Sequence, residues 1–392
     1  MEVTMLVSCS LVSVLVLAPP EVQVVPAAPT VELLRVPDAG IQPQVVVSAD
    51  GTVHLLYFQG DADAGDLFYV ARAKTERDFT APTRVNSQSG SACAIGNDRG
   101  GKLAVGRGGA VHVVWNGSER THAKGEEERA PFLYARRSAG ATTFDAQRNL
   151  MTRSSTLDGG GDVIADEKGR VLAIWHALPV DVKEHSETSR RVFVATSTDD
   201  GTTFAGENAV SAANSGTCGC CALEAGLLRG GEIAILFRAA TDSTDRGTHL
   251  LRSKDGGATF VETTLDHWKI EMCPMTTAAI ASSSDANAIA WQDREEIKWA
   301  RPSESAATES VALGGQHAGV RKYPALAIDA QRRTLVAWTE GMGWKKGGRA
   351  QWAIFDANGA PIEGATGGAD GVPAWSLVGA FAKPEGGFVV VY

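Results

Sequence analysis

The chain has 392 residues, of which 44% are hydrophobic, so it is long enough for one large or two ordinary domains and too apolar for a disordered segment. Its formal net charge is −9 and its Lys and Arg residues form no basic stripe, which argues against nucleic acid and anionic membranes as partners. The 43 glycines and the shortage of long apolar runs favour many short strands joined by tight turns.

The first segment in chain order is an apolar run at residues 5–18, followed by a Pro- and Ala-rich stretch. The run has the length of a signal peptide and is too short to span a membrane comfortably. We therefore expect residues 1–28 to be an export segment and residues 29–392 to form a single domain in the periplasm or outside the cell. The alternatives are a lipid anchor, because Leu6-Val7-Ser8-Cys9 resembles a lipoprotein box, and a buried N-terminal strand or helix. No other segment is expected to cross a membrane.

A short pattern recurs along the rest of the chain: a turn, then alternating apolar residues that end in an aromatic residue. The copies read "GTVHLLYF", "GAVHVVWN", "GRVLAIWH", "GEIAILFR", "NAIAWQ", "RTLVAWT" and "GGFVVVY". Alternation with a period of two is typical of a β-strand. Neighbouring copies lie roughly 45–60 residues apart, which is the length of one four-stranded propeller blade.

Each copy is preceded by another apolar strand and most are followed by a second hairpin, so the repeating unit has four strands, named A to D. Six full units fit the sequence, and residues 375–392 supply a final A–B pair. Residues 31–36, "VELLRV", are expected to add an outer strand to that pair and to close the ring. The sequence therefore predicts an all-β propeller with six or seven blades and does not decide between the two numbers.

Two turns between strands C and D match the pattern S-x-D-x-G-x-T-F: "STDDGTTF" at 197–204 and "SKDGGATF" at 253–260. We expect Asp199 and Asp255 to accept hydrogen bonds within the turn, the glycine to adopt positive φ and the phenylalanine to pack beneath. Degenerate copies lie at 138–144 and 74–79. From about residue 40 to its end the chain thus resembles the sialidase-like superfamily of Asp-box, or BNR-repeat, propellers, and in particular bacterial members that carry C-x-C-C and C-P-M segments.

The resemblance implies that the Asp boxes lie on the face away from the ligand site and have no catalytic role. It also implies exo-sialidase-type glycoside hydrolysis, which some members perform with an Arg-Ile-Pro motif and a Tyr–Glu nucleophile pair. Here Arg35-Val36-Pro37 is close to that motif but precedes the expected first inner strand, and no Tyr–Glu pair is found. The resemblance therefore bears on the fold more than on the activity.

In such a propeller the D-to-A and B-to-C connections share one face, and binding residues concentrate on loops held by a rigid scaffold. Arg238 suits a carboxylate or a sulfate, Asp242 is its expected partner or a general acid, and His176 is a candidate for proton transfer. The predicted ligand-binding residues are Asn116, Gln292, Arg294 and Tyr323. Further polar candidates are Arg99, Asp162, Glu224, Asp293, Lys322, Thr339 and Glu340. The alternative for each is a polar strand end that meets solvent or caps backbone groups.

Three cysteines, Cys218, Cys220 and Cys221, fall in the D-to-A connection that enters the fourth unit, and Cys273 and Met275 fall in the next one. Because such connections lie side by side in adjacent blades, we expect them to converge. Three interpretations remain open. The sulfur atoms bind a soft metal, copper or zinc; Cys273 forms a disulfide with a member of the triplet; or the cysteines are buried as small hydrophobic residues.

These features lead to three hypotheses of function. The first is an exported propeller that binds a glycan or a small anionic ligand in its central funnel, with exo-sialidase-type hydrolysis as its activity. Glycosidases usually need two carboxylates at a defined separation, and the sequence identifies no such pair. The second is a soft-metal or thiol-redox propeller built on the cysteines, and the third is a noncatalytic scaffold. The substrate and the oligomeric state do not follow from the sequence.

Overall fold

The computed structural model describes residues 1–2, 29–122, 130–182, 186–302, 311–313 and 319–392, so the predicted export segment lies outside the described residues except for its first two positions. This part of the chain forms seven sheets and contains no α-helix. Its only helical elements are 3-10 turns: η1 (Pro37–Ala39), η2 (Ile95–Asn97), η3 (Arg107–Gly109), η4 (Glu119–Thr121), η5 (Glu187–Ser189) and η6 (Arg229–Gly231). Within the described residues, no helix has the length and apolar character needed to cross a membrane.

Each sheet is one blade, and in the first six blades the four main strands follow one another in chain order from the inside of the ring outward. The first blade contains β2 (Ile41–Val47), β3 (Val53–Gln59), β4 (Asp66–Arg72) and β5 (Thr83–Arg84). The second contains β6 (Lys102–Val105), β7 (Val111–Asn116), β8 (Phe132–Arg137) and β9 (Arg148–Asn149). The third contains β11 (Asp162–Ala165), β12 (Val171–Pro179), β13 (Arg191–Ser197) and β14 (Asn208–Ala209). A short extra strand, β10 (Ser154–Ser155), pairs with the end of β12.

The fourth blade contains β15 (Glu224–Leu227), β16 (Ile233–Arg238), β17 (Thr248–Ser253) and β18 (Val261–Thr264). The fifth contains β19 (Ala278–Ser282), β20 (Asn287–Asp293), β21 (Glu296–Ala300) and β22 (Val311–Ala312). The sixth contains β23 (Arg321–Ile328), β24 (Thr334–Glu340), β25 (Gly348–Phe355) and β26 (Pro361–Val372). The seventh blade contains β27 (Gly379–Ala382), β28 (Phe388–Val391) and β1 (Val31–Leu34).

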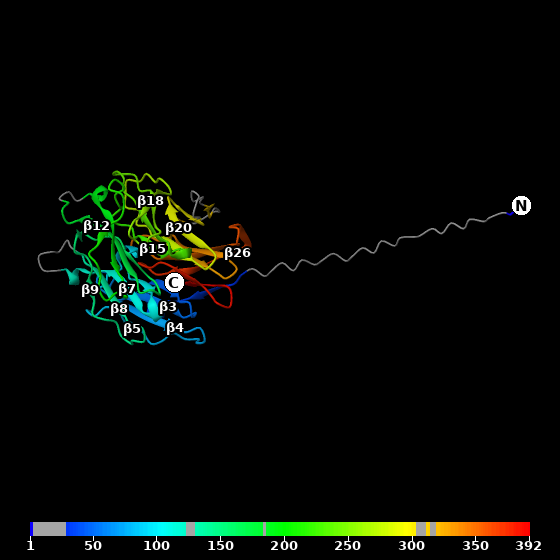
Figure 1. The fold of residues 1–392 in the computed structure, drawn as a ribbon, viewed down its shortest axis with the longest axis horizontal. Helices are drawn as coiled ribbons and strands as arrows, with labels where there is room; N and C mark the ends of the chain where they lie inside the picture. Colours follow the sequence, from blue (N-terminus) through cyan, green and yellow to red (C-terminus); the bar gives the residue numbers. More distant parts are fainter. Residues whose placement is uncertain (3–28, 123–129, 183–185, 303–310, 314–318) are drawn as a thin grey trace.

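The innermost strands form a closed ring. Strands β2, β6, β11, β15, β19, β23 and β27 each contact the next, and β27 contacts β2 again. In Figure 1 the sheets accordingly follow one another around the molecule in the order of the sequence, from blue to red. The number of blades is therefore seven, which resolves the choice that the sequence left open.

The two ends of the described fold close the seventh blade together. Strand β1 pairs with β28 in parallel, with Val31 opposite Phe388 and Leu34 opposite Val391. The pairing continues past the strands, because Val36 N donates to Tyr392 O at 3.1 Å. This confirms that residues 31–36 supply the missing outer strand. Ring closure leaves no exposed inner edge on which another chain could pair.

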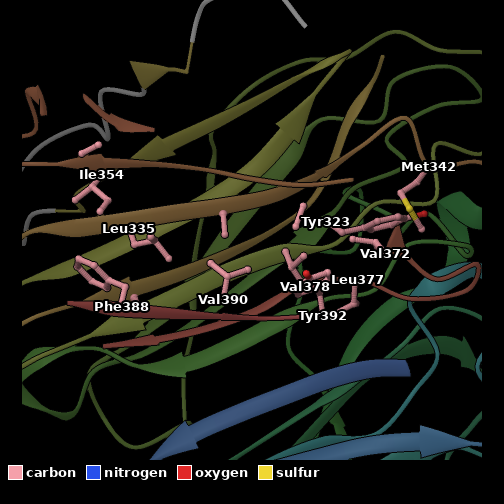
Figure 2. Packing of buried hydrophobic residues seen from close by; sticks show 14 residues of the cluster. Tyr323, Leu335, Met342, Ile354, Val372, Leu377, Val378, Phe388, Val390 and Tyr392 are labelled. Carbon is pink, nitrogen blue, oxygen red and sulfur yellow. The ribbon is translucent and has the colours of Figure 1, made fainter. Parts of the chain in front are cut away.

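The core lies between neighbouring blades. The strand-B aromatics Trp115, Trp175 and Trp291 are fully buried, and burial of each such ring contributes on the order of 3 kcal/mol. Figure 2 shows the same packing between the sixth and seventh blades, where Leu335 and Phe388 belong to one apolar cluster. The alternation read from the sequence thus buries one face of each sheet against the next sheet.

Antiparallel order divides the connections between two faces of the ring. The A-to-B and C-to-D turns lie on one, which we call the Asp-box face, and the B-to-C and D-to-A connections lie on the other, which we call the mouth face. On the Asp-box face the expected turn is confirmed: Thr203 donates to Asp199 from its N (2.8 Å) and its Oγ1 (2.7 Å), and Gly201 N donates to Ser197 Oγ at 2.9 Å. The bonds from Thr203 hold the pKa of Asp199 below its ordinary value. Both Asp boxes therefore have a structural role, far from the cysteines.

Candidate functional site

Three thiols gather at the mouth face in the connection that enters the fourth blade. Cys218, Cys220 and Cys221 are buried, and their Sγ atoms all lie within 4.8 Å of one another. Cys218 Sγ is 3.6 Å from Cys220 Sγ and 3.6 Å from Cys221 Sγ, whereas a disulfide requires about 2.05 Å. All five described cysteines, Cys93 and Cys273 included, are free thiols. The predicted disulfide between Cys273 and the triplet is therefore wrong.

The triplet is positioned by backbone bonds to three other segments. Cys218 N donates to Arg238 O of β16 at 2.8 Å, and Ala222 N donates to Thr276 O, in the connection that enters the fifth blade, at 3.0 Å. From the third blade, Gly159 N donates to Gly219 O at 2.6 Å. Contacts between blades, rather than a local motif, therefore set the positions of the thiols.

Cys221 is the thiol best suited to ionise. Burial raises its pKa, but hydrogen bonding with Cys218 and Cys220, together with the charge of Arg238, outweighs burial and lowers the pKa of Cys221 well below its ordinary value. Thr276 adds donors from its N and its Oγ1, each 3.4 Å from Cys221 Sγ. The pKa of Cys220 is raised, because its thiol bonds to Cys218 and Cys221 and is buried. Within the triplet, Cys221 is therefore the residue whose surroundings most favour ionisation.

The connection that enters the fifth blade brings Met275 and Thr276 to this group, and not Cys273. Met275 packs against the triplet. Its backbone is left-handed, with φ of 47°, and this bend separates the buried Thr276 from Cys273, which is exposed. The predicted convergence of four cysteines is therefore wrong, because only three of the described cysteines converge.

Left-handed backbone recurs where the chain enters a blade. Such non-glycine residues at these entries are Gln42, Asn97, Thr156, Met275, Tyr323 and Trp375. Each costs roughly 1 kcal/mol or more, so the surrounding contacts must hold it in place. Gln42 is held by bonds from its Nε2 to Ala94 O (2.6 Å) and Trp375 O (2.7 Å), and its Oε1 accepts from Gly100 N at 2.7 Å. The mouth face is therefore braced across the first, second and seventh blades.

Asp98 is a buried carboxylate that the sequence analysis missed. Its side chain is 0% exposed, and neither carboxylate oxygen has a hydrogen-bond partner. Arg99 Nη1 is 3.7 Å from Asp98 Oδ1, but the hydrogen bonds of Arg99 go to Asp158 and to Ile95 O. Burial raises the pKa of Asp98 well above its ordinary value; Arg99 opposes the rise and Cys221 adds to it. Asp98 is thus within electrostatic reach of the triplet.

Lys322 and Tyr323 approach the same region from the sixth blade. Lys322 Nζ donates to Pro274 O at 2.7 Å and lies 5.3 Å from the centroid of the Tyr323 ring. Burial lowers the pKa of Lys322, and the charges of Cys221 and Asp98 oppose that effect. Tyr323 is buried beside Met342 and Val372 (Figure 2), and its ligand-binding role stays a prediction.

Arg238, which the sequence analysis expected to bind a carboxylate or a sulfate, is buried, and its guanidinium is bonded inside the protein. Nε donates to Thr276 Oγ1 (2.9 Å), Nη1 to Arg246 O (2.6 Å) and Nη2 to Gln292 O (2.5 Å). The guanidinium carbon also stands 4.9 Å from the centroid of the Trp268 ring. Arg238 therefore joins the fourth and fifth blades beneath the triplet, while its contact with a ligand stays a prediction.

Asp242 is exposed on the mouth face and caps its own turn. Its Oδ1 accepts from Thr244 N at 2.7 Å and from Asp245 N at 2.5 Å. These bonds lower the pKa of Asp242. The carboxylate therefore has local partners in place of the expected Arg238.

His176 is buried beneath the triplet. Its Nε2 lies 2.7 Å from Cys221 O, and its Nδ1 has no hydrogen-bond partner. Burial, assisted by the charge of Arg190, lowers the pKa of His176 to about 4. The imidazole is thus neutral near pH 7 and can donate its Nε2 proton to the carbonyl of Cys221, which helps to hold the backbone of the triplet.

The remaining predicted ligand-binding residues also have partners within the protein. Asn116 Nδ2 donates to Asp158 O at 2.8 Å, and Gln292 Nε2 donates to Arg294 O at 2.6 Å. Arg294 is largely exposed and pairs with Asp293 at 2.9 Å. Asn116 therefore connects two segments of the mouth, Gln292 bonds within its own hairpin, and of these three residues only Arg294 presents its side chain to solvent.

A second polar cluster lies inside the ring on the innermost strands of the second, third and fourth blades. Lys102 Nζ is 2.5 Å from Glu224 Oε2, and Asp162 Oδ2 accepts from Ala225 N at 2.7 Å. The three side chains line one cavity with a volume of about 240 Å³. Burial and the charge of Glu224 raise the pKa of Asp162 to about 7, against the opposing charge of Lys102.

The sequence analysis identified Asp162, Glu224 and Lys322 as polar candidates where the chain enters a blade, but it missed Asp98, Thr276 and Lys102. Asp98 directly precedes Arg99, which was selected as a polar residue just before an inner strand. The sequence could therefore have predicted the position of Asp98 by the same criterion. The sequence could not predict that Asp98 lacks hydrogen-bond partners, because that property depends on contacts among several blades.

No protein-family model matches this chain, and neither does any curated protein sequence. Solved structures do match it. A protein of unknown function from Dyadobacter fermentans is 15% identical, with a TM-score of 0.52 over 86% of this chain and 96% of that one. The Hadza microbial sialidase Hz136 is 14% identical, with a TM-score of 0.51 over 77% and 64%. An alpha-L-arabinanase from Penicillium chrysogenum, in complex with arabinobiose, is 10% identical, with a TM-score of 0.53 over 82% and 94%. The chain has the fold of the sialidase-like propellers, as the Asp boxes predicted.

Proposed function

We propose that the protein binds a soft metal ion, Cu(I) or Zn(II), through Cys218, Cys220 and Cys221 at the mouth of the propeller. The observation that carries this proposal is the spacing of the three buried sulfur atoms. A tetrahedral ion with metal–sulfur distances of about 2.3 Å holds its sulfur ligands about 3.8 Å apart. Two of the Sγ pairs are 3.6 Å apart, so little rearrangement is needed on binding.

The chemistry of the donors selects the metal. Thiolates favour Cu(I) and Zn(II) over Mg²⁺ and Ca²⁺, which prefer oxygen ligands. The surroundings of Cys221 favour its ionised form, and Arg238 supplies a positive charge that offsets part of the negative charge of the ligands. Because the backbone of the triplet is fixed by three neighbouring segments, the ligands are preorganised and the loss of chain entropy on binding is small.

The test is the metal content of the full chain after reduction, loading with Zn(II) or Cu(I) and removal of excess ion. We expect about one ion per wild-type chain and little or none in Cys218→Ser, Cys220→Ser or Cys221→Ser. Cys273→Ser is the matched control, because Cys273 is an exposed thiol outside the group, and it should retain the ion. Equal loss in Cys221→Ser and Cys273→Ser, or no metal in a wild-type protein with all thiols reduced, would overturn the proposal.

A second candidate function is glycoside hydrolysis, and the pair Asp162 and Glu224 favours it. A carboxyl group whose pKa is raised to about 7 beside a second carboxyl group is the pattern of a general acid and its partner. Two proteins of the same fold are named a sialidase and an alpha-L-arabinanase. In this candidate function Arg238 and His176 remain the predicted anion-binding and proton-transfer residues, and the ligand is a glycan.

Fluorogenic sialosides and arabinofuranosides test this second function. Turnover that disappears in Asp162→Asn and Glu224→Gln but persists in Asp242→Asn, whose carboxylate only caps a turn, would support it. No turnover across the panel by a metal-loaded, folded wild-type protein would count against it. Export to the periplasm or the medium belongs to both candidate functions, and sequencing the N-terminus of the protein recovered from those fractions tests it.

A further inference from the structure

Asp98 has no hydrogen-bond partner that explains its burial. Among the described residues it is the only carboxylate with both oxygens buried and without a hydrogen bond. A buried carboxylate that lacks donors is strongly unfavourable, and such a group in a folded protein calls for a ligand or a neighbouring donor. Arg99 does not supply one, because its hydrogen bonds are made to Asp158 and Ile95.

The Asp98 carboxylate lies close to the side chain of Met275. A Cβ atom built on Gly96 would lie 2.6 Å from Met275 Cε and 2.8 Å from Asp98 Oδ1, so both atoms border one point. Met275 in turn packs against the cysteine triplet. Met275 therefore contacts the triplet and also lies beside Asp98, which brings an oxygen acceptor near the thiols.

Three thiolates leave one position of a tetrahedral metal ion for a fourth ligand. Two groups lie near the triplet: Met275, which packs against it, and Asp98, which lies beside Met275. If the Met275 thioether filled the position, the Asp98 carboxylate would still lack a donor. If instead a small molecule with an O–H or N–H group filled it, that group would donate to Asp98, and both the metal and the carboxylate would be satisfied.

We propose that Asp98 binds the exchangeable fourth ligand of the metal, a small molecule whose metal-binding atom carries O–H or N–H, with water in that place when no other ligand is present. This rests on the proposed function. It makes the mouth a site for binding a ligand to the metal rather than a closed structural site, since structural sites use four protein ligands and open sites use three.

The experiment uses the full chain loaded with Co(II), whose absorption reports thiolate ligands and coordination geometry. Methylamine and azide are the probes: the nitrogen of methylamine that binds the metal keeps its hydrogens, and azide has none. We expect both probes to change the wild-type spectrum. Asp98→Leu, which replaces an unbonded carboxylate by an apolar group of similar size, should weaken methylamine binding about tenfold and leave azide unchanged or tighter. Cys273→Ser should behave as wild type.

The outcomes separate the two proposals. Absence of cobalt–thiolate absorption in the wild type would refute the metal site, and this inference with it. If that absorption is present, two results would overturn the role of Asp98 alone. One is a wild-type spectrum that neither probe changes while Met275→Leu alters it, which would make Met275 the fourth ligand. The other is equal weakening of both probes in Asp98→Leu. The wild-type response to methylamine does not depend on any variant folding.

Discussion

The two faces of the propeller are stabilised in different ways. On the Asp-box face each turn is satisfied by its own residues, as where Ser197, Asp199 and Thr203 bond to one another over seven positions of the chain. On the mouth face the important contacts join residues from different blades, such as Arg238 with Thr276 and Gln292. Local motifs therefore specify the scaffold, and long-range packing specifies the site.

This contrast predicts the largest loss of stability for the mouth. In Arg238→Leu, three buried acceptors on Thr276, Arg246 and Gln292 lose their donor. Each loss costs about 1–3 kcal/mol, so we expect the free energy of unfolding to fall by about 4 kcal/mol. Urea denaturation followed by tryptophan fluorescence measures this. A fall below about 1 kcal/mol would mean that Arg238 does not join the blades.

On the Asp-box face, the loss of stability caused by replacing a turn glycine with alanine should depend on how much room the added methyl group has. Gly201 has φ of 75°, and a Cβ there would lie 1.9 Å from Tyr134 Oη. Gly140, in the degenerate copy of the motif, has φ of 74° and nothing within 4 Å. We expect Gly140→Ala to cost about 1 kcal/mol from backbone conformation alone and Gly201→Ala about 1–2 kcal/mol more. Equal costs in the same denaturation assay would contradict the packing of the turn on Tyr134.

A third prediction concerns the cluster inside the ring. The pKa of Asp162 rises from 3.8 to about 7 on folding, so the folded state binds this proton more tightly than the unfolded state. The contribution of Asp162 to stability is therefore highest below about pH 4 and declines as the pH rises to about 7. Asp162→Asn should remove that part of the decline, whatever its effect at a single pH. Denaturation of both proteins at several pH values tests this, and parallel profiles would show that Asp162 ionises normally.

The fold could be predicted from the sequence almost completely, because its signals are local. Period-two alternation, the strand-B aromatics and the Asp boxes each lie within a few consecutive residues. The segment "VELLRV" likewise predicted the strand that closes the ring. The site could be predicted only in part. The triplet is adjacent in sequence and was found, but the exposure of Cys273 and the isolation of Asp98 depend on how separate blades meet.

The smallest effect is expected at Cys273. Its thiol is exposed and outside the group, so Cys273→Ser should change the free energy of unfolding by less than about 0.5 kcal/mol. Cys221→Ser, a chemically identical change, should by contrast abolish the stabilisation that Zn(II) gives the wild type in thermal melts, since an ion that binds only the native state raises its stability. If Zn(II) stabilised the two variants equally, the claim that the triplet binds zinc and Cys273 does not would be wrong.

X-ray absorption at the metal edge of the zinc- or copper-loaded chain tests the central claim most directly, because it counts sulfur neighbours of the ion. Three buried thiols at the mouth predict a shell of about three sulfur atoms at about 2.3 Å. A shell of nitrogen and oxygen atoms alone, or a sulfur shell unchanged in Cys221→Ser, would contradict it.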